Sequence, residues 1–199
     1  MVKLAEFRRT LAYPLIKPIA RFLSHTPITP NIITCSGFLL TLVAASLIIT
    51  RNLLPAGAIV IVAGLFDMFD GALARHINRV TRFGAILDST IDRLSEAALF
   101  ISVLAIHAYD QSFAGVLLAS AALIGSMMVS YIRSAAEGKG IECQVGLFTR
   151  PERVIVLALG LLLNPLTGNS LFIGLFIIAL LSFFTAGQRL FYTWQRTKN

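Results

Sequence analysis

Long apolar runs separated by short polar segments follow one another along most of the chain. The runs occupy 32–50, 53–74, 83–108, 113–133, 150–163 and 171–192. A membrane-crossing helix needs about 20 mostly apolar residues, and all of these runs except 150–163 come near that length. The pattern predicts an all-α integral membrane protein with six transmembrane helices, bundled over 32–192 within a single domain, 1–199.

Two polar segments contain signals for the start of a helix. The segment 26–31, Thr-Pro-Ile-Thr-Pro-Asn, breaks the preceding helix and predicts Asn31 as the N-cap of the next one. The segment 149–152, Thr-Arg-Pro-Glu, has the pattern of a capping box with proline in the first turn. We therefore expect the fifth helix to start at Thr149, with Arg150 and Arg153 in its first turn.

The segment 1–24 mixes basic and apolar residues at nearly helical spacing. It carries five cations, and Pro14 and Pro18 interrupt its apolar residues, so it is a poor secretion signal. Such a composition suits a helix that lies in the plane of the lipid headgroups. We predict an amphipathic interfacial helix there.

The composition supports the membrane class. Of 199 residues, 56% are hydrophobic and 14% charged, which is too apolar for a water-soluble surface. The net charge of +7 comes without a basic stripe interleaved with aromatic residues, so we expect no nucleic-acid partner.

The distribution of the seventeen Lys and Arg residues orients the predicted helices. All except Arg51 and Arg93 fall in the N-terminal segment, around the loops after the second and fourth runs, or towards the C-terminus. Cytoplasmic loops of membrane proteins are rich in Lys and Arg. We expect a multi-pass protein of the cell membrane, with both termini and the facing ends of the second and third helices in the cytoplasm.

Four carboxylates interrupt the second and third apolar runs. Asp67 and Asp70 are three residues apart, and Asp88 and Asp92 are four apart, so each pair projects from one face of its helix. An Asp at a membrane helix centre costs roughly 2.5 to 3.5 kcal/mol. Converging carboxylate oxygens suit Mg²⁺ or Mn²⁺ as compensation, with two ions expected.

The same stretch contains residues suited to binding a pyrophosphate. Gly71 and Gly84 allow close backbone approach, and Arg75 can hold a phosphate bidentately. Asp92, the last of the four carboxylates, is the best candidate for a general base.

These residues resemble the signature of the CDP-alcohol phosphatidyltransferases. The motif Asp67-x2-Asp70-Gly71-x2-Ala74-Arg75-x8-Gly84-x3-Asp88-x3-Asp92 matches that family at every position. The resemblance implies a homodimer that transfers a substituted phosphate from CDP-diacylglycerol or CDP-archaeol to an alcohol and releases CMP. It implies metal ligation by Asp67, Asp70, Asp88 and Asp92, with Asp92 also accepting a proton. The residues that it places at the CDP moiety are Pro30, Asn31, Ile32, Ile33, Gly71, Arg75 and Thr81.

A basic cluster follows the fourth run and indicates an acceptor that carries phosphate. Arg133 and Arg153 are the residues that we expect to bind this phosphate, with Arg189 as a third. The segments 131–133, 137–140 and 146–153 resemble the branch of the family that uses inositol 1-phosphate. Glycerol 3-phosphate would need similar cations and stays open as an alternative.

Other roles for these charges are also open. The four aspartates could pair with Arg75, Arg79, Arg82 and Arg93 as structural salt bridges. Glu96, one turn beyond Asp92, is expected to pair with Arg93 or a polar neighbour rather than to bind metal. A cation transporter is the rival function, because carboxylates within a membrane also mark ion pathways.

Overall fold

The computed structural model describes residues 29–76 and 81–198, and this part of the chain is helical without any strand. The predicted interfacial helix at 1–24 lies outside the described residues. The helices are α2 (Pro30–Ile49), α3 (Leu53–His76), α4 (Arg82–Tyr109), α5 (Phe113–Glu137), α6 (Arg150–Thr167) and α7 (Ser170–Thr197). Each corresponds to one of the six predicted runs.

The two predicted helix starts have different outcomes. Asn31 is not the N-cap of α2, because the helix begins at Pro30 and Thr29 takes the cap position, accepting the backbone N–H of Ile32 at 3.4 Å. Proline suits the first turn because its missing N–H would have no partner there. The capping box of α6 is confirmed: the backbone N–H of Thr149 donates to the Glu152 carboxylate at 2.8 Å.

Helix α6 is longer than its apolar run predicts. It continues past 163 through Pro165 and ends at Gly168, which has the left-handed φ of 73°. The Gly168 backbone N–H donates to the carbonyl of Asn164 at 2.8 Å. A glycine in this conformation is a common helix terminator because it has no Cβ to clash.

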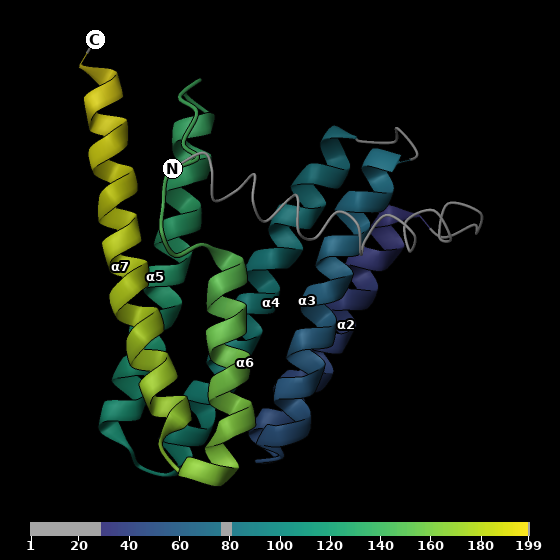
Figure 1. The fold of residues 1–199 in the computed structure, drawn as a ribbon, viewed down its shortest axis with the longest axis vertical. Coiled ribbons are helices and arrows are strands. Elements are labelled where there is room, and N and C mark those ends of the chain that lie inside the picture. The colour runs from purple at the N-terminus through teal and green to yellow at the C-terminus, as the bar shows by residue number, and fades with distance from the viewer. Residues whose placement is uncertain (1–28, 77–80, 199) are drawn as a thin grey trace.

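The helices run alternately up and down, so the starts of α2, α4 and α6 face the same way as the ends of α3, α5 and α7 (Figure 1). Helix α2 packs against α3 and α4, whereas α6 packs against α3 and α7. Helix α6 begins further down the bundle than the neighbouring ends of α5 and α7 (Figure 1). Its first turn is therefore set into the bundle rather than at its rim.

The buried apolar core lies towards the opposite end of the helices. It includes Leu99, Phe100 and Val103 of α4, together with Leu161 of α6 and Leu175 of α7. Leucine, isoleucine and phenylalanine side chains also cover much of the outer surface, as expected where lipid replaces water as the solvent. Four helices, α2, α3, α5 and α7, are long and apolar enough to cross a membrane. The chain is therefore an all-helical membrane protein.

Helices α4 and α6 do not meet that apolar criterion within the described residues. Helix α4 carries Asp88, Asp92, Arg93 and Glu96, and α6 begins with a charged first turn. These polar residues lie at the end of the bundle away from the core, where they form the site described next.

Candidate active site

Two carboxylates from α3 and one from α4 converge near the end of the bundle. One oxygen from each of Asp67, Asp70 and Asp88 lies within 4.8 Å of the others. The i,i+3 spacing on α3 turns Asp67 and Asp70 towards the same face, and α4 brings Asp88 to that face. The structure thus brings together three of the four aspartates predicted to bind metal.

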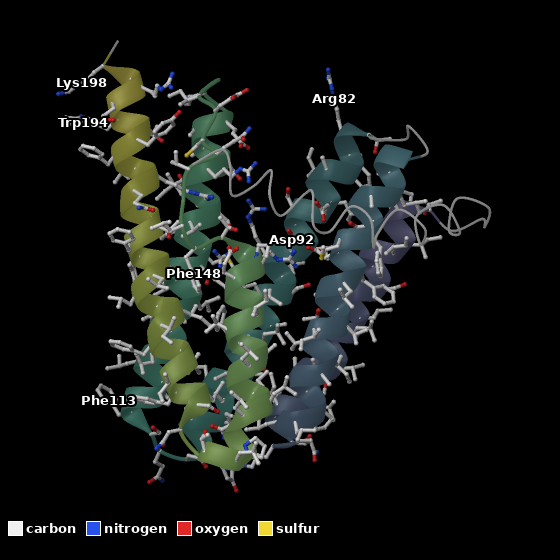
Figure 2. The ribbon with its side chains drawn as sticks, viewed as in Figure 1. Arg82, Asp92, Phe113, Phe148, Trp194 and Lys198 are labelled. Carbon is white, nitrogen blue, oxygen red and sulfur yellow. The ribbon has the colours of Figure 1, made fainter. Side chains whose placement is uncertain are left out.

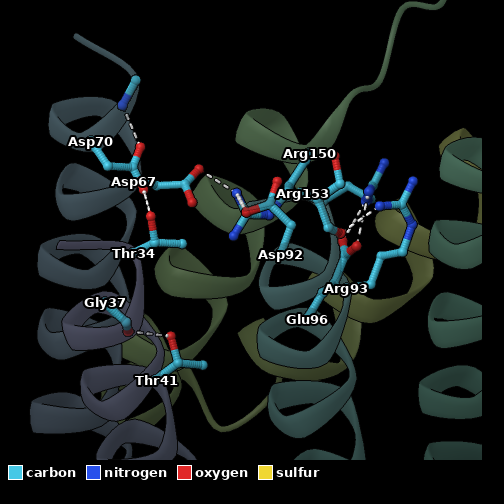
Figure 3. A network of polar contacts seen from close by, with 12 residues as sticks. Thr34, Gly37, Thr41, Asp67, Asp70, Asp92, Arg93, Glu96, Arg150 and Arg153 are labelled. Carbon is cyan, nitrogen blue, oxygen red and sulfur yellow. Dashed lines mark hydrogen bonds and ion pairs between the residues drawn. The ribbon is translucent and has the colours of Figure 1, made fainter. Parts of the chain in front are cut away.

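Asp70 is held in place by a hydroxyl from α2. It is only 4% exposed, and its Oδ2 accepts the Thr34 hydroxyl at 2.6 Å (Figure 3). Its Oδ1 accepts the backbone N–H of Gly71 at 2.5 Å. Both contacts restrict rotation of the carboxylate, which matters for a metal ligand because ligand orientation is set by such supporting hydrogen bonds. Thr34 was not among the residues predicted from the sequence.

Asp92, which projects from α4 (Figure 2), lies beside this cluster and contacts Arg150 from the first turn of α6 (Figure 3). Arg150 Nη1 is 2.7 Å from Asp92 Oδ1 and also pairs with Asp67 Oδ2. Asp92 Oδ1 is buried and makes no hydrogen bond of good geometry. A single guanidinium therefore links the carboxylates of α3 and α4 through the start of α6.

Among the described residues, Asp67 and Asp92 pair with Arg150 and not with Arg93, one of the partners in the alternative structural role. Arg93 instead donates to the Ser89 carbonyl and to the Ser134 hydroxyl, the latter at 2.8 Å. The side chain of Arg75, and the whole of Arg79, lie outside the described part of the structure. The capping box at Thr149 was the sequence signal that placed Arg150 on the first turn.

The starts of α2 and α4 lie close together beside the carboxylates. Thr81 caps α4 by accepting the Gly84 backbone N–H at 2.9 Å. A Cβ on Gly84 would lie 2.9 Å from the Thr81 hydroxyl and 3.4 Å from Asn31 Oδ1. A side chain at this position would therefore press on the hydroxyl that caps α4, whereas its contact with Asn31 would be an ordinary one. Two residues predicted to contact the CDP moiety, Asn31 and Thr81, meet here, next to Pro30, Ile32 and Ile33 on the first turn of α2.

A cavity of about 700 Å³ opens on the other side of α4. Asp88 and Asp92 line it on one side, and the three arginines predicted to bind the acceptor phosphate, Arg133, Arg153 and Arg189, line it as well. These arginines come from α5, α6 and α7. The structure thus places the proposed base and the predicted acceptor cations around one space.

The three arginines are held differently. Arg133 is half-exposed, and its Nε donates to Glu137 at 2.8 Å. Arg189 is buried and donates to the backbone carbonyls of Val145 at 2.8 Å and Val129 at 2.6 Å. Arg153 is 1% exposed and forms a bidentate ion pair with Glu96. Glu96 was expected to pair with Arg93 or a polar neighbour, and its partner in the structure is Arg153.

The donor set fits a divalent cation. Three carboxylate oxygens gather within 4.8 Å, and hard oxygen ligands of this kind suit Mg²⁺ and Mn²⁺. Asp92 Oδ1, which is buried and lies 2.7 Å from Arg150 Nη1, is a further carboxylate oxygen beside them. Asp67, Asp70 and Asp88 are the residues that could hold the ion, with Asp92 at its edge.

The matching family model and the similar relatives point to the same protein family. Residues 27–187 match the family model of CDP-alcohol phosphatidyltransferase. The chain is 38% identical over 187 residues to archaetidylinositol phosphate synthase of Methanothermobacter thermautotrophicus, covering 92% of this chain and 90% of that one. It is 35% identical over 202 residues to phosphatidylinositol phosphate synthase of Mycobacterium tuberculosis, covering 98% and 92%.

Solved structures of the Mycobacterium tuberculosis phosphatidylinositol phosphate synthase are similar over most of the chain. The structure with CDP-DAG bound has a TM-score of 0.83 and 33% identity, covering 91% of this chain and 94% of that one. The complex with manganese and citrate has a TM-score of 0.81 and 34% identity, covering 89% and 88%. The fold around the carboxylate cluster is therefore shared with proteins crystallised with a CDP-linked lipid and with a divalent cation.

Proposed function

The chain belongs to the CDP-alcohol phosphatidyltransferase family, and we propose that it transfers the substituted phosphate of a CDP-linked lipid to inositol 1-phosphate, releasing CMP. One observation carries the choice of a phosphorylated acceptor. Asp92, the proposed base, lines the same cavity of about 700 Å³ as Arg133, Arg153 and Arg189. An acceptor whose phosphate binds the arginines can present a hydroxyl to Asp92 across this space.

The arginines favour phosphate over an uncharged polyol. Guanidinium groups match phosphate oxygens in charge and in their forked geometry. Charged side chains in a membrane protein are rare and commonly mark the pathway of a charged substrate. Inositol 1-phosphate is preferred to glycerol 3-phosphate because the relatives reported above are named as inositol phosphate synthases.

The proposed reaction is a direct displacement. Asp92 takes the proton from the acceptor hydroxyl, and the hydroxyl oxygen forms a bond to the β-phosphorus of the CDP-linked lipid. The bond between that phosphorus and the bridging oxygen breaks, and CMP leaves with the bridging oxygen. Arg150, which contacts Asp92 at 2.7 Å, holds the carboxylate in the position where it receives the proton.

We propose Asp67, Asp70, Asp88 and Asp92 as ligands of two divalent ions, Mg²⁺ or Mn²⁺. Ions bound there supply positive charge that offsets the negative charge of the pyrophosphate and of departing CMP. The chain itself fixes the ligands, through the Thr34 hydrogen bond to Asp70 and the helix geometry of α3 and α4.

The donor is proposed to lie across the starts of α2 and α4. Asn31 and Thr81 approach each other there around Gly84, and Gly71 follows the metal ligand Asp70 directly. Arg75, one turn beyond Gly71, completes the proposed CDP contact by sequence position. Either CDP-diacylglycerol or CDP-archaeol presents this same head group.

We propose a single domain over 1–199 that crosses the cell membrane six times, with both termini and the site on the cytoplasmic side. The charges of α4 and α6 lie around the inward-facing cavity, which allows these helices to cross despite their polarity. We further propose a homodimer. Helix α7 has exposed phenylalanines, among them Phe176 (53% exposed) and Phe184 (55% exposed). These side chains offer an apolar surface for lipid or for a second copy of the chain.

The site favours an enzyme over a cation transporter. A permeation route needs polar groups along its whole length. Beyond Glu96, α4 continues into the buried apolar core at Leu99, Phe100 and Val103.

Purified protein tests the proposed function. With a CDP-linked lipid, inositol 1-phosphate and Mg²⁺, we expect CMP release that Asp92→Asn abolishes. Asp110→Asn, at the opposite end of α4 where Asp110 pairs with Arg51, is the matched control and should keep activity. Full activity of Asp92→Asn would show that Asp92 is not the general base.

A further inference from the structure

Glu96 forms a buried ion pair with Arg153 at the wall of the cavity (Figure 3). Arg153 Nε donates to Glu96 Oε1 at 2.5 Å, and Nη2 donates to Oε2 at 3.0 Å. The Glu96 side chain is 5% exposed and the Arg153 side chain is 1% exposed. Such a two-point contact fixes the plane of the guanidinium as well as its position.

The remaining hydrogen bonds of Arg153 leave part of its donor set available. Nη1 donates to the Phe148 carbonyl at 3.5 Å, so three of the five guanidinium N–H groups have partners among the described residues. The other two N–H groups of the buried guanidinium have no partner among the described residues. Since Arg153 lines the cavity that also contains Arg133 and Arg189, an anion there can reach it.

Glu96 stands apart from the aspartates of the motif. It lies one turn beyond Asp92 on α4, and its carboxylate faces α6 instead of the cluster on α3. Both of its oxygens accept from Arg153. The Glu96 carboxylate therefore pairs with the Arg153 guanidinium and makes no hydrogen bond or ion pair with the proposed metal ligands among the described residues.

We propose that Glu96 is a positioning residue for the acceptor: it holds the Arg153 guanidinium in the plane that binds the phosphate of the phosphorylated alcohol. This inference rests on the proposed function. A buried arginine that lost its bidentate partner would turn towards other acceptors, and the other two N–H groups would no longer be presented together.

Steady-state kinetics of Glu96→Gln test the proposal, with inositol 1-phosphate and the CDP-linked lipid varied separately. The amide keeps the size of the side chain but can accept from only one arm of the guanidinium. We expect the KM for inositol 1-phosphate to rise at least tenfold. The KM for the donor and kcat at saturating acceptor should each change less than threefold.

A structural role alone would give a different result. An acceptor KM within threefold of the wild-type value in folded Glu96→Gln would overturn the proposal, whereas a loss of folded protein lowers only the apparent kcat. Glu96→Asp, which keeps the charge, should recover part of the acceptor KM. Combining Glu96→Gln with Arg153→Gln should raise that KM no further than Arg153→Gln alone, and additive effects would also contradict the proposal.

The controls separate this inference from the proposed function. Asp110→Asn removes a carboxylate from an ion pair at the far end of the bundle and should match the wild type in all three constants. If Glu96→Gln is poorly folded in detergent, Glu96→Asp carries the test. If the wild-type protein uses no phosphorylated alcohol, the proposed function is refuted. If the wild type is active and Glu96→Gln has the same KM for the acceptor, only the role of Glu96 is refuted.

Discussion

Arg150 Nη1 lies 2.7 Å from Asp92 Oδ1. The same nitrogen pairs with Asp67, so the first residue of α6 connects the carboxylates of two helices that approach the site from opposite directions. Since α6 also packs against α3, the position of its first turn determines where the proposed base lies relative to the proposed metal ligands.

Replacing Arg150 by Gln should lower kcat at least tenfold, a loss of about 1.4 kcal/mol of transition-state stabilisation. Without the guanidinium, Asp92 loses its fixed orientation. The concentration of Mn²⁺ needed for half-maximal activity should not increase, because the carboxylates lose a competing cation. Arg150→Lys should retain more activity, and Arg51→Gln, whose partner is the distant Asp110, is the control. Unchanged kcat in Arg150→Gln would contradict this role.

Thr34→Val removes the hydroxyl that donates to Asp70 at 2.6 Å and keeps nearly the same shape. Metal affinity typically falls about tenfold or more when such a supporting hydrogen bond is lost. We expect a corresponding rise in the half-saturating Mn²⁺ concentration, measured from CMP release. Thr41→Val is a matched control on the same helix, because the Thr41 hydroxyl donates only to the Gly37 carbonyl at 3.0 Å among the described residues. Equal behaviour of the two variants would count against the Thr34 role.

Gly146→Ala should weaken acceptor binding through the segment that follows α5. Gly146 has a φ of 139°, and a Cβ there would lie 2.8 Å from Thr185 Cγ2 and 3.2 Å from Arg189 Nε. Displacing Arg189 should raise the KM for inositol 1-phosphate several-fold. Gly140→Ala, at a φ of 76° with nothing within 4 Å of the added Cβ, controls for backbone strain of about 1 to 3 kcal/mol. A larger effect at Gly140 than at Gly146 would rule out the packing explanation.

Chelation of divalent cations should abolish CMP release, and added Mg²⁺ or Mn²⁺ should restore it. Asp67→Asn, Asp70→Asn and Asp88→Asn each remove the negative charge of one converging carboxylate, so each should lower kcat/KM by about two orders of magnitude or more. Direct Mn²⁺ binding measured by electron paramagnetic resonance checks the cause. Asp→Asn variants that bind Mn²⁺ as the wild type does would exclude these residues as ligands.

Local sequence signals predicted local structure well. The capping box at Thr149 is confirmed because its two partners are three residues apart and their interaction depends on one turn of helix. The N-cap of α2 was assigned to Asn31 instead of Thr29, because two polar residues flank Pro30 and the proline itself belongs to the helix.

Contacts between distant segments could not be predicted in the same way. Glu96 and Arg153 are 57 residues apart, and their pairing depends on how far α6 begins below the ends of its neighbours. Arg93 was the expected partner because it is near in sequence, but it contacts Ser134 of α5 at 2.8 Å. The motif spacing identified the aspartates, whereas the arginine that bridges them and the threonine that supports Asp70 required the packed bundle.

The acceptor specificity of the purified protein tests the central claim most directly. Inositol 1-phosphate, free inositol and glycerol 3-phosphate would each be supplied with Mg²⁺ and a CDP-linked lipid, and the lipid products identified by mass spectrometry together with CMP. We predict product from inositol 1-phosphate at a kcat/KM at least tenfold above the other two. Preferential use of free inositol would contradict the role assigned to Arg133, Arg153 and Arg189, and preferential use of glycerol 3-phosphate would contradict the proposed acceptor.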